Sequence, residues 1–380
     1  MRFFTKTHTL FCLGLFSGCQ TLSPGAGPTA LPTPQYSATL SFSPSPSPMP
    51  TPTALPTPWT PPPLLDTCRE DLSLAEPHDV AITRDGSRLF FSTLDARLYE
   101  LVNSQAKQIK NKEGKCLFGR AEQIEIDSKG NLFVAASWRF EQVYFGSQVY
   151  FVKPDLSEIK VVSEYNAKYI PKPQGTPPVG TYHEGIADLF VSTENKGFLM
   201  WGKHRTELTD NDYMVIPFSE ELQIATPYLL ARGLNKITPI TYEDKSRKLY
   251  FFMEEGDSTN FNLPNSAVIP TPFSSKNKFS FIFDSRLEPK TGELIVNDWD
   301  RIIKFNPHTQ QIISIAGQAR EHAFMDGAGD KARFNQIKAL DIDAAGNIYV
   351  ADSGNRAIRK ITPEGMVSTL YRAPTPSASP

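Results

Sequence analysis

Four side chains that could hold a metal ion or take part in acid–base chemistry precede strand-like segments at three places in the sequence. His78 stands in "EPHDVAI", Glu122 in "EQIEID", and His183 with Glu184 in "HEGIADLF". An imidazole combined with carboxylates is a ligand set that suits zinc or another divalent cation. The sequence therefore nominates these four residues as a metal or ligand site. The alternative is that they are solvated strand ends.

The segments that must position these residues repeat along the chain. "LDIDAAGNIYVADSGNRAIRK", from Leu340, alternates apolar and polar residues and places Gly346-Asn347 at a tight hairpin turn. Weaker copies begin at Asp79, Gln123, Gly185, Pro239 and Phe281. Each unit indicates four antiparallel strands, which bury both faces only by stacking on further copies. Six such units predict an all-β fold, a six-bladed β-propeller of four-stranded antiparallel blades.

Alignment of the units assigns one residue per blade to the position just before the innermost strand. These residues are His78, Glu122, Glu184, Thr238, Phe279 and Lys338. In a propeller they would surround one end of the central channel.

The last unit also resembles a known family. Residues Asp326 to Gly365 are similar to an NHL repeat, on the basis of Ala332–Asn335, Ile342-Asp343, Gly346-Asn347, Tyr349–Asp352 and Asn355 before Ile358. The resemblance implies an NHL-type propeller over residues 77–371. The chain departs from the family pattern at 337–339, where Ile-Lys-Ala replaces the usual Pro-x-Gly. Asp343 and Asp352, at strand ends, are predicted to accept hydrogen bonds in turns.

Some propeller enzymes similar to this fold, such as the amidating lyases and the gluconolactonase-like enzymes, hold a metal at the channel. Only His78 stands where the lyases have a repeated Pro-His, and a set of three histidines from three blades is missing. No motif in the sequence requires a cofactor. For a divalent cation at this site, zinc and calcium are the candidates. The set is incomplete, so we favour binding over catalysis and keep an exported metal-dependent lyase or lactonase as the alternative.

The N-terminal residues predict an export signal followed by an extended linker. Arg2, Lys6 and a short apolar run precede Ser17-Gly18-Cys19, which resembles the lipobox of bacterial lipoproteins. We expect a signal peptide over 1–18, a lipidated Cys19 with a Pro/Ser/Thr-rich linker over 19–63, the propeller over 64–371 and a disordered tail over 372–380. This predicts a lipid-anchored protein of the bacterial cell envelope, at the outer membrane if the host has one. The alternative is an ordinary signal peptide with an incidental Cys19.

Two cysteines, Cys68 and Cys116, remain in the predicted globular part. In an exported domain a pair of cysteines predicts one disulfide. Two reduced, buried thiols are the alternative.

The charge balance and the export signal limit the partners. The formal net charge is −2, which provides no field for nucleic acid. We expect a monomer whose only membrane contact is its lipid anchor. Its partner would be a protein, a glycan or a small molecule at the propeller face. Long segments from Tyr165 and from Met253 could carry that recognition, or could equally serve as covers over a propeller end.

Overall fold

The computed structural model describes most of the chain after Glu76. The described residues are 76–93, 97–110, 114, 120–140, 144–168, 183–192, 197–204, 212–218, 228–231, 237–253, 269–274 and 279–374. The chain divides into two units, residues 1–59 and residues 60–380, and all described residues belong to the second. Cys19, Cys68 and Cys116 lie outside the described residues.

The described residues form six sheets, almost without helix. The first contains β1 (Pro77–Ile82), β2 (Leu89–Thr93), β3 (Leu98–Val102) and β4 (Gln105–Gln108). The second contains β5 (Arg120–Ile126), β6 (Leu132–Phe140), β7 (Tyr144–Val152) and β8 (Ile159–Lys168). The third contains β9 (His183–Val191), β10 (Gly197–His204), β11 (Asp212–Phe218) and β12 (Tyr228–Ala231).

The remaining sheets follow in chain order. The fourth contains β13 (Ile237–Glu243), β14 (Lys248–Met253) and β15 (Ile269–Ser274). The fifth contains β16 (Ile282–Leu287), β17 (Leu294–Asp298), β18 (Arg301–Phe305) and β19 (Ile312–Gly317). The sixth contains β20 (Gly327–Ala328), β21 (Ile337–Ile342), β22 (Ile348–Asp352), the short 3₁₀ helix η2 (Ser353–Asn355), β23 (Ala357–Ile361) and β24 (Met366–Arg372).

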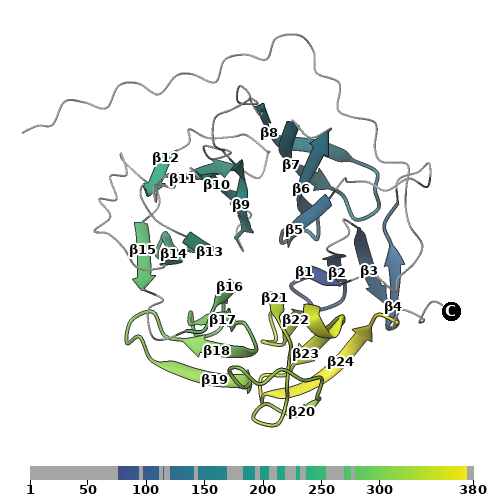
Figure 1. Cartoon of the computed structure of the whole chain (residues 1–380), viewed down its shortest axis with the longest axis vertical. Helices are drawn as coiled ribbons and strands as arrows, with labels where there is room; N and C mark the ends of the chain where they lie inside the picture. Colours follow the sequence, from purple (N-terminus) through teal and green to yellow (C-terminus); the bar gives the residue numbers. More distant parts are fainter. Residues whose placement is uncertain are drawn as a thin grey trace, which may run out of the picture. The chain divides into compact units, whose positions relative to one another are not determined.

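These sheets are arranged as a propeller. The first strand of each sheet, or β21 in the sixth, lies innermost, and Figure 1 shows these strands around a common centre. Each inner strand contacts the next, in the order β1, β5, β9, β13, β16 and β21, and β21 contacts β1. The last and first inner strands therefore lie side by side where the ring closes, and none of the described strands is exchanged between those two sheets.

The four predicted antiparallel strands are confirmed in five sheets, one of which has an additional short strand, and the prediction is wrong for the fourth sheet. In the fourth sheet the meander is interrupted, because β15 follows a long connection and pairs parallel to β14. In the sixth sheet an additional short strand, β20, pairs with the outer strand β24. This added strand covers part of a sheet edge that would otherwise present unpaired backbone groups.

Apolar side chains fill the spaces between neighbouring sheets. Phe90 of the first sheet packs with Ile124 of the second, and both are fully buried. At the closure, Phe91 of the first sheet packs with Tyr349 and Ile358 of the sixth. Burial of such side chains supplies the main stabilising free energy of stacked sheets.

The turn between the first two strands is built alike in the second and sixth sheets. Asp127 accepts hydrogen bonds from the backbone N–H and the side-chain amide of Asn131 at 2.8 Å each. Asp343 accepts the same two bonds from Asn347 at 2.9 and 2.8 Å. The predicted role of Asp343 as a turn acceptor is confirmed, and so is that of Asp352, which accepts from the side-chain amide of Asn355 in the following turn at 3.0 and 2.9 Å.

No helix among the described residues is long and apolar enough to cross a membrane.

Candidate functional site

Every inner strand has a β-bulge four positions before its last residue. In the first sheet the pairing with β2 skips one residue between Pro77 and Asp79, and the same irregularity recurs in the other five sheets. The skipped residues are His78, Glu122, Ala187, Pro239, Phe283 and Lys338. A bulge bends a strand and redirects a side chain, so one residue per sheet is displaced at the same level of the ring.

Three residues from the sequence alignment occupy these bulges. His78, Glu122 and Lys338 are the bulge residues of their sheets. In the other sheets the alignment selected Glu184, Thr238 and Phe279, whereas the bulges fall later in the chain, at Ala187, Pro239 and Phe283. The repeats are weakest in the third and fourth sheets, where the sequence offers few residues to fix the alignment.

Four bulge residues from four sheets line one cavity at this end of the channel. His78, Glu122, Phe283 and Lys338 surround a volume of about 230 Å³. Deeper in the cavity its wall includes Gln123 and the carboxylates Asp79, Glu125, Asp188 and Asp284. The sequence predicted two residues of this wall as site residues, His78 and Glu122.

The other two nominated residues lie on β9. His183 pairs with His204 and Glu184 with Lys203 in the backbone register of β9 and β10, while their side chains lie outside the described part of the chain. In the part that is described, no group of three or more His, Cys, Asp or Glu side chains is arranged to hold a metal ion. Zinc or calcium at the channel stays a prediction.

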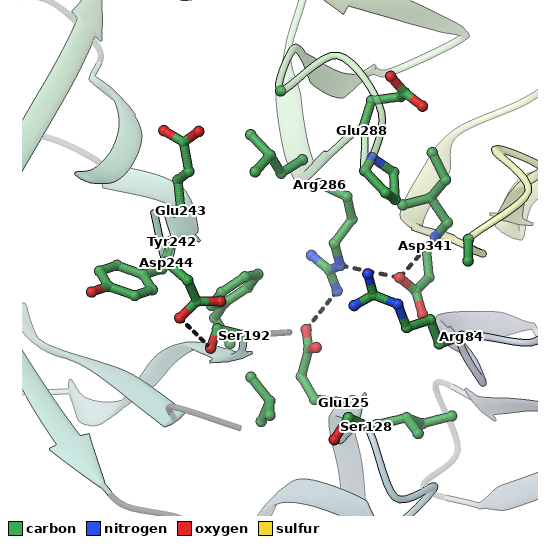
Figure 2. Close-up of a pocket in the computed structure, with 18 of the residues that line it drawn as sticks. Arg84, Glu125, Ser128, Ser192, Tyr242, Glu243, Asp244, Arg286, Glu288 and Asp341 are labelled. Carbon is green, nitrogen blue, oxygen red and sulfur yellow. Dashed lines mark hydrogen bonds and ion pairs between the residues drawn. The ribbon is translucent and has the colours of Figure 1, made fainter. Parts of the chain in front are cut away.

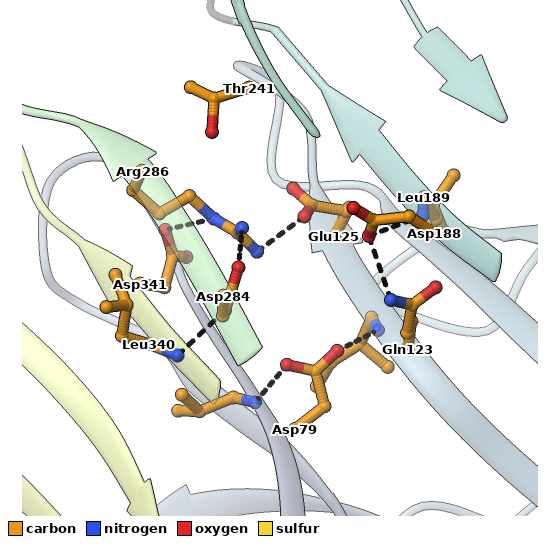
Figure 3. A network of polar contacts seen from close by, with 12 residues as sticks. Asp79, Gln123, Glu125, Asp188, Leu189, Thr241, Asp284, Arg286, Leu340 and Asp341 are labelled. Carbon is orange, nitrogen blue, oxygen red and sulfur yellow. Dashed lines mark hydrogen bonds and ion pairs between the residues drawn. The ribbon is translucent and has the colours of Figure 1, made fainter. Parts of the chain in front are cut away.

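Polar side chains link neighbouring inner strands all the way around the ring. Figure 3 shows part of this network, including the contacts of Asp188 and Asp284. Each link joins one sheet to the next at 2.7–3.0 Å. In order they are Asp79 Oδ2 with Ile124 N, Gln123 Nε2 with Asp188 Oδ1, Ser192 Oγ with Asp244 Oδ1, Thr241 Oγ1 with Ser285 O, Asp284 Oδ2 with Leu340 N, and Asp341 Oδ2 with Ile82 N.

Three of these links, those through Asp79, Asp284 and Asp341, satisfy backbone N–H groups that the sheets leave open. The innermost strand of each sheet pairs with another strand on one side only. The N–H groups on its unpaired side therefore need acceptors elsewhere in the protein. Asp79 accepts from Val80 of its own strand at 2.8 Å and from Ile124 of the next. Asp284 does the same with Ser285 and Leu340, and Asp341 with Ile342 and Ile82.

Arg286 lies across the channel in the middle of this ring. Its guanidinium group donates to Asp284 on its own strand and to Glu125 on β5, both at 2.6 Å. The Nε atom lies 3.6 Å from Asp341 on β21. All four side chains are largely buried. One cation from the fifth sheet thus contacts carboxylates of the second, fifth and sixth sheets.

Arg286 and Glu125 separate two cavities, because both residues line each of them. The second cavity, of about 370 Å³, lies at the other end of the inner strands. In Figure 2 its wall carries Ser192, Tyr242 and Asp244 on one side and Arg84 beside Arg286 on the other. Among the described residues, the channel therefore contains two cavities with an ion-pair network between them.

The buried carboxylates of the network hold their protons unusually strongly. Burial, together with the nearby charge of Asp284, raises the pKa of Asp79 to about 8. Burial raises the pKa of Asp341 to about 6, although Arg286 opposes the shift. Burial likewise raises the pKa of Glu125 and of Asp284. Burial disfavours the charge of Arg286, but Asp284 and Glu125 outweigh it and raise the pKa of the guanidinium.

Sequence reasoning missed Arg286 and the linking aspartates. Three of the aspartates, Asp79, Asp188 and Asp284, occupy the same position of the repeat, directly after the bulge residue. This recurrence is the signal that the sequence offered. A repeated aspartate beside a buried strand indicates an acceptor for backbone N–H groups. Nothing in the local sequence around Arg286 shows that its partner is Glu125, because that contact depends on closure of the ring.

The fold and the polar channel define the chain as an all-β propeller. No family model matches the sequence, and neither does any curated protein sequence. Solved structures with a similar chain path include virginiamycin B lyase from Staphylococcus aureus. It is 10% identical, with 78% of this chain and 84% of that chain covered, at a TM-score of 0.38.

Two further structures are similar at the same level. A protein of unknown function from Bacteroides thetaiotaomicron is 12% identical over 78% of this chain and 58% of that chain, with a TM-score of 0.37. A streptogramin B lyase is 10% identical over 80% of this chain and 85% of that chain, with a TM-score of 0.35. Such low scores support no conclusion about the activity of this chain.

Proposed function

We propose that this protein is a lipid-anchored cell-envelope propeller that binds a ligand at the channel end where the inner strands begin. The observation that carries the proposal is the first cavity, where His78, Glu122, Phe283 and Lys338 come from four different sheets. The ion pair of Arg286 with Glu125 lies in its wall. A polar cavity at the axis of a rigid ring is suited to recognition.

The proposal includes the finer family assignment. The six sheets are interpreted as the six blades of an NHL-type propeller. This interpretation is supported by the matching turns at Asp127 and Asp343 and by the bulge at the same level of every inner strand. The long segments from Tyr165 and Met253, which fall largely outside the described residues, would extend the binding face around this cavity.

Anchoring at Cys19 is tested by Cys19→Ser. The variant chain should move from the membrane fraction to the soluble fraction, because it loses the acceptor of the lipid. The soluble Cys19→Ser chain then serves for all binding measurements. Unchanged membrane fractionation of the variant would contradict the anchor.

The ligand site is tested by retention of the Cys19→Ser chain on purified envelope material. His78→Ala and Lys338→Ala should each weaken retention, because both side chains line the cavity. Arg88→Ala is the matched control, since Arg88 pairs with Glu100 on the first sheet and is absent from the cavity wall. Equal retention of all variants and the parent would place recognition elsewhere.

The proposal includes a disulfide between Cys68 and Cys116, as expected for an exported protein. Peptide mapping without reductant should recover one crosslinked peptide that contains both residues. Two separately alkylated thiols would show that the disulfide does not form.

A second candidate function is a metal-dependent lyase or lactonase. It is favoured by one observation, that His78 and Glu122 line the same cavity. Elemental analysis of the Cys19→Ser chain, purified without a His-tag or chelator, tests it. Stoichiometric zinc or calcium that is lost in His78→Ala would support the enzyme, whereas two metal-free proteins would favour the binding function.

A further inference from the structure

Three aromatic rings form a cluster that extends from the first cavity to the surface. Phe283 lines the cavity, and its ring centre lies 5.3 Å from that of Trp299 and 4.8 Å from that of Phe281. Phe281 and Trp299 are 5.6 Å apart, and Phe281 is 36% exposed. We call Phe281, Phe283 and Trp299 the aromatic platform. The platform extends from Phe283, the bulge residue, to Phe281, which is exposed to solvent.

The backbone holds Trp299 in an unusual conformation. Trp299 connects β17 and β18 with a φ of +62°, and the N–H of Asp300 donates to the carbonyl of Asp298 at 2.8 Å. This is the rarer form of γ-turn, which is strained. A positive φ is uncommon for a bulky side chain.

The surroundings fix this strained turn in place. The carboxylate of Asp298, which is fully buried, accepts from the N–H of Phe281 at 2.8 Å and from Arg301 Nε at 2.8 Å. The carbonyl of Trp299 accepts from the N–H of Ile337 at 2.8 Å. Glycine or asparagine would adopt the turn more easily. Trp299 is only half-buried, so packing of the core does not explain why an indole occupies this position. Strained backbone of this kind is concentrated at functional sites.

Lys338 completes the platform from the neighbouring sheet. Its ammonium lies 4.2 Å from the centre of the Phe283 ring and 5.5 Å from that of Trp299. Partial burial lowers the pKa of Lys338, and the charge of Glu76 partly opposes this shift. The cavity wall thus offers a donor at Lys338 and acceptors at Glu122 and Gln123.

We propose that the cavity and the aromatic platform bind a neutral carbohydrate chain. This deepens the proposed function, on which it rests, by naming the class of ligand. A pyranose ring has an apolar face of C–H groups and a rim of hydroxyls that both donate and accept. The platform suits the apolar face. The rim suits Lys338, Glu122 and Gln123. Beside the platform these residues present one cation and one carboxylate, which together favour no charged substituent, while deeper in the cavity Arg286 is paired with Asp284 and Glu125.

The dimensions agree with this ligand. A cavity of about 230 Å³ is smaller than the roughly 300–1,000 Å³ of pockets for drug-sized molecules. It therefore suits a single sugar ring. The planes of Trp299 and Phe281 are 75° apart, so the next sugar of the chain would stack on one of these rings and contact the edge of the other. An aromatic peptide fits less well, because a second ring offers no rim of hydroxyls to the polar wall.

The test uses the full Cys19→Ser chain and isothermal titration with four neutral tetrasaccharides of glucose, N-acetylglucosamine, mannose and xylose. A tetrasaccharide of uronic acids is the charged counterpart. We expect saturable binding of at least one neutral probe. Trp299→Ala and Phe281→Ala should each weaken it by about tenfold, the effect of one lost stacking contact. Phe281→Ala keeps the test decisive if Trp299→Ala fails to fold, because Phe281 is the most exposed member.

Phe324→Ala is the matched control. Phe324 stacks on Arg372 at 3.9 Å in the sixth sheet and is not part of the platform, so this variant should bind like the parent. Binding of the uronic acids alone, or a Phe281→Ala variant with the affinity of the parent, would overturn the inference. If no neutral probe binds but envelope retention still depends on His78, the carbohydrate class is wrong and the proposed function stands. If a neutral probe binds and Cys19→Ser stays in the membrane, the anchor is wrong instead.

Discussion

Arg286 Nη2 and Glu125 Oε1 lie 2.6 Å apart across the channel, although 161 positions separate them in the sequence. The pair joins the inner strand of the fifth sheet to that of the second and lies between the two cavities of the channel. Arg286 is the cation at the centre of a group of four buried carboxylates, Asp79, Glu125, Asp284 and Asp341. The stability of the ring should therefore depend strongly on this one side chain.

Replacement of Arg286 by methionine should lower the free energy of unfolding by about 3–5 kcal/mol, the cost of removing one partner from a buried ion pair. Urea denaturation at neutral pH measures it. Arg88→Met is the matched control, because Arg88 pairs with Glu100 at 2.7 Å on the surface, where such a pair contributes about 0–1 kcal/mol. Equal losses for the two variants would show that the central network is not important for stability.

Asp341 should be necessary for closure of the ring. Its carboxylate accepts from Ile82 N at 2.7 Å and so ties the sixth sheet to the first. Asp341→Asn presents an amide to one of the two N–H groups and should cost about 1–3 kcal/mol. Hydrogen exchange should show faster exchange at Ile82 than at Leu340, whose acceptor is Asp284. Asp330→Asn, at an exposed side chain, should change neither amide.

The protein should become less stable as the pH rises from about 4 to about 8. The pKa of Asp79 is raised from 3.8 to about 8 in the folded state. The folded chain therefore retains a proton that the unfolded chain loses above its own pKa. The stabilisation is complete below pH 4 and is lost as the pH passes through the folded value, and Asp341, with a pKa of about 6, acts in the same direction.

Urea denaturation at several pH values between 5 and 9 checks this dependence. Asp79→Asn removes the titrating group at nearly the same volume, so its free energy of unfolding should fall less steeply over that range. A variant with the same slope as the parent would mean that Asp79 is ionised throughout.

Arg359 should not be replaceable by lysine. Its side chain is fully buried, and its guanidinium group donates to Asp352 at 2.8 Å, to Asp326 at 3.0 Å and to the carbonyl of Met325 at 2.8 Å. One ammonium cannot reproduce this fork of donors. Arg359→Lys should therefore cost about 1.5–3 kcal/mol, the range for a lost hydrogen bond to a charged group.

Thermal or urea unfolding measures the loss at Arg359. Arg320→Lys is the control, because Arg320 is exposed, and it should unfold like the parent. A similar stability of both lysine variants would contradict the role assigned to Arg359.

The sequence predicted much of the fold because its signals are local. Gly130-Asn131 and Gly346-Asn347 mark hairpin turns that the structure confirms through Asp127 and Asp343. Alternation of apolar residues predicted the strands on either side, since each strand packs its two faces against neighbouring sheets. Only β15 of the fourth sheet was not predicted, because its parallel pairing with β14 spans a long connection with no turn signal.

The candidate site was predicted only in part for the same reason. His78, Glu122 and Lys338 stand beside clear strand patterns, and the structure places them at one cavity. Phe283 was missed because the bulge in β16 lies within the strand pattern, where the sequence does not mark it.

The sequence by itself determined the all-β class, the hairpin turns and the repeated order of strands, because each depends on the residues within one unit. Only the tertiary structure decided which residues meet at the axis. Arg286 finds Glu125, and Asp341 finds Ile82, only after all the sheets have closed into a ring. Contacts of this kind join residues far apart in the chain, so neither residue type nor local spacing specifies them.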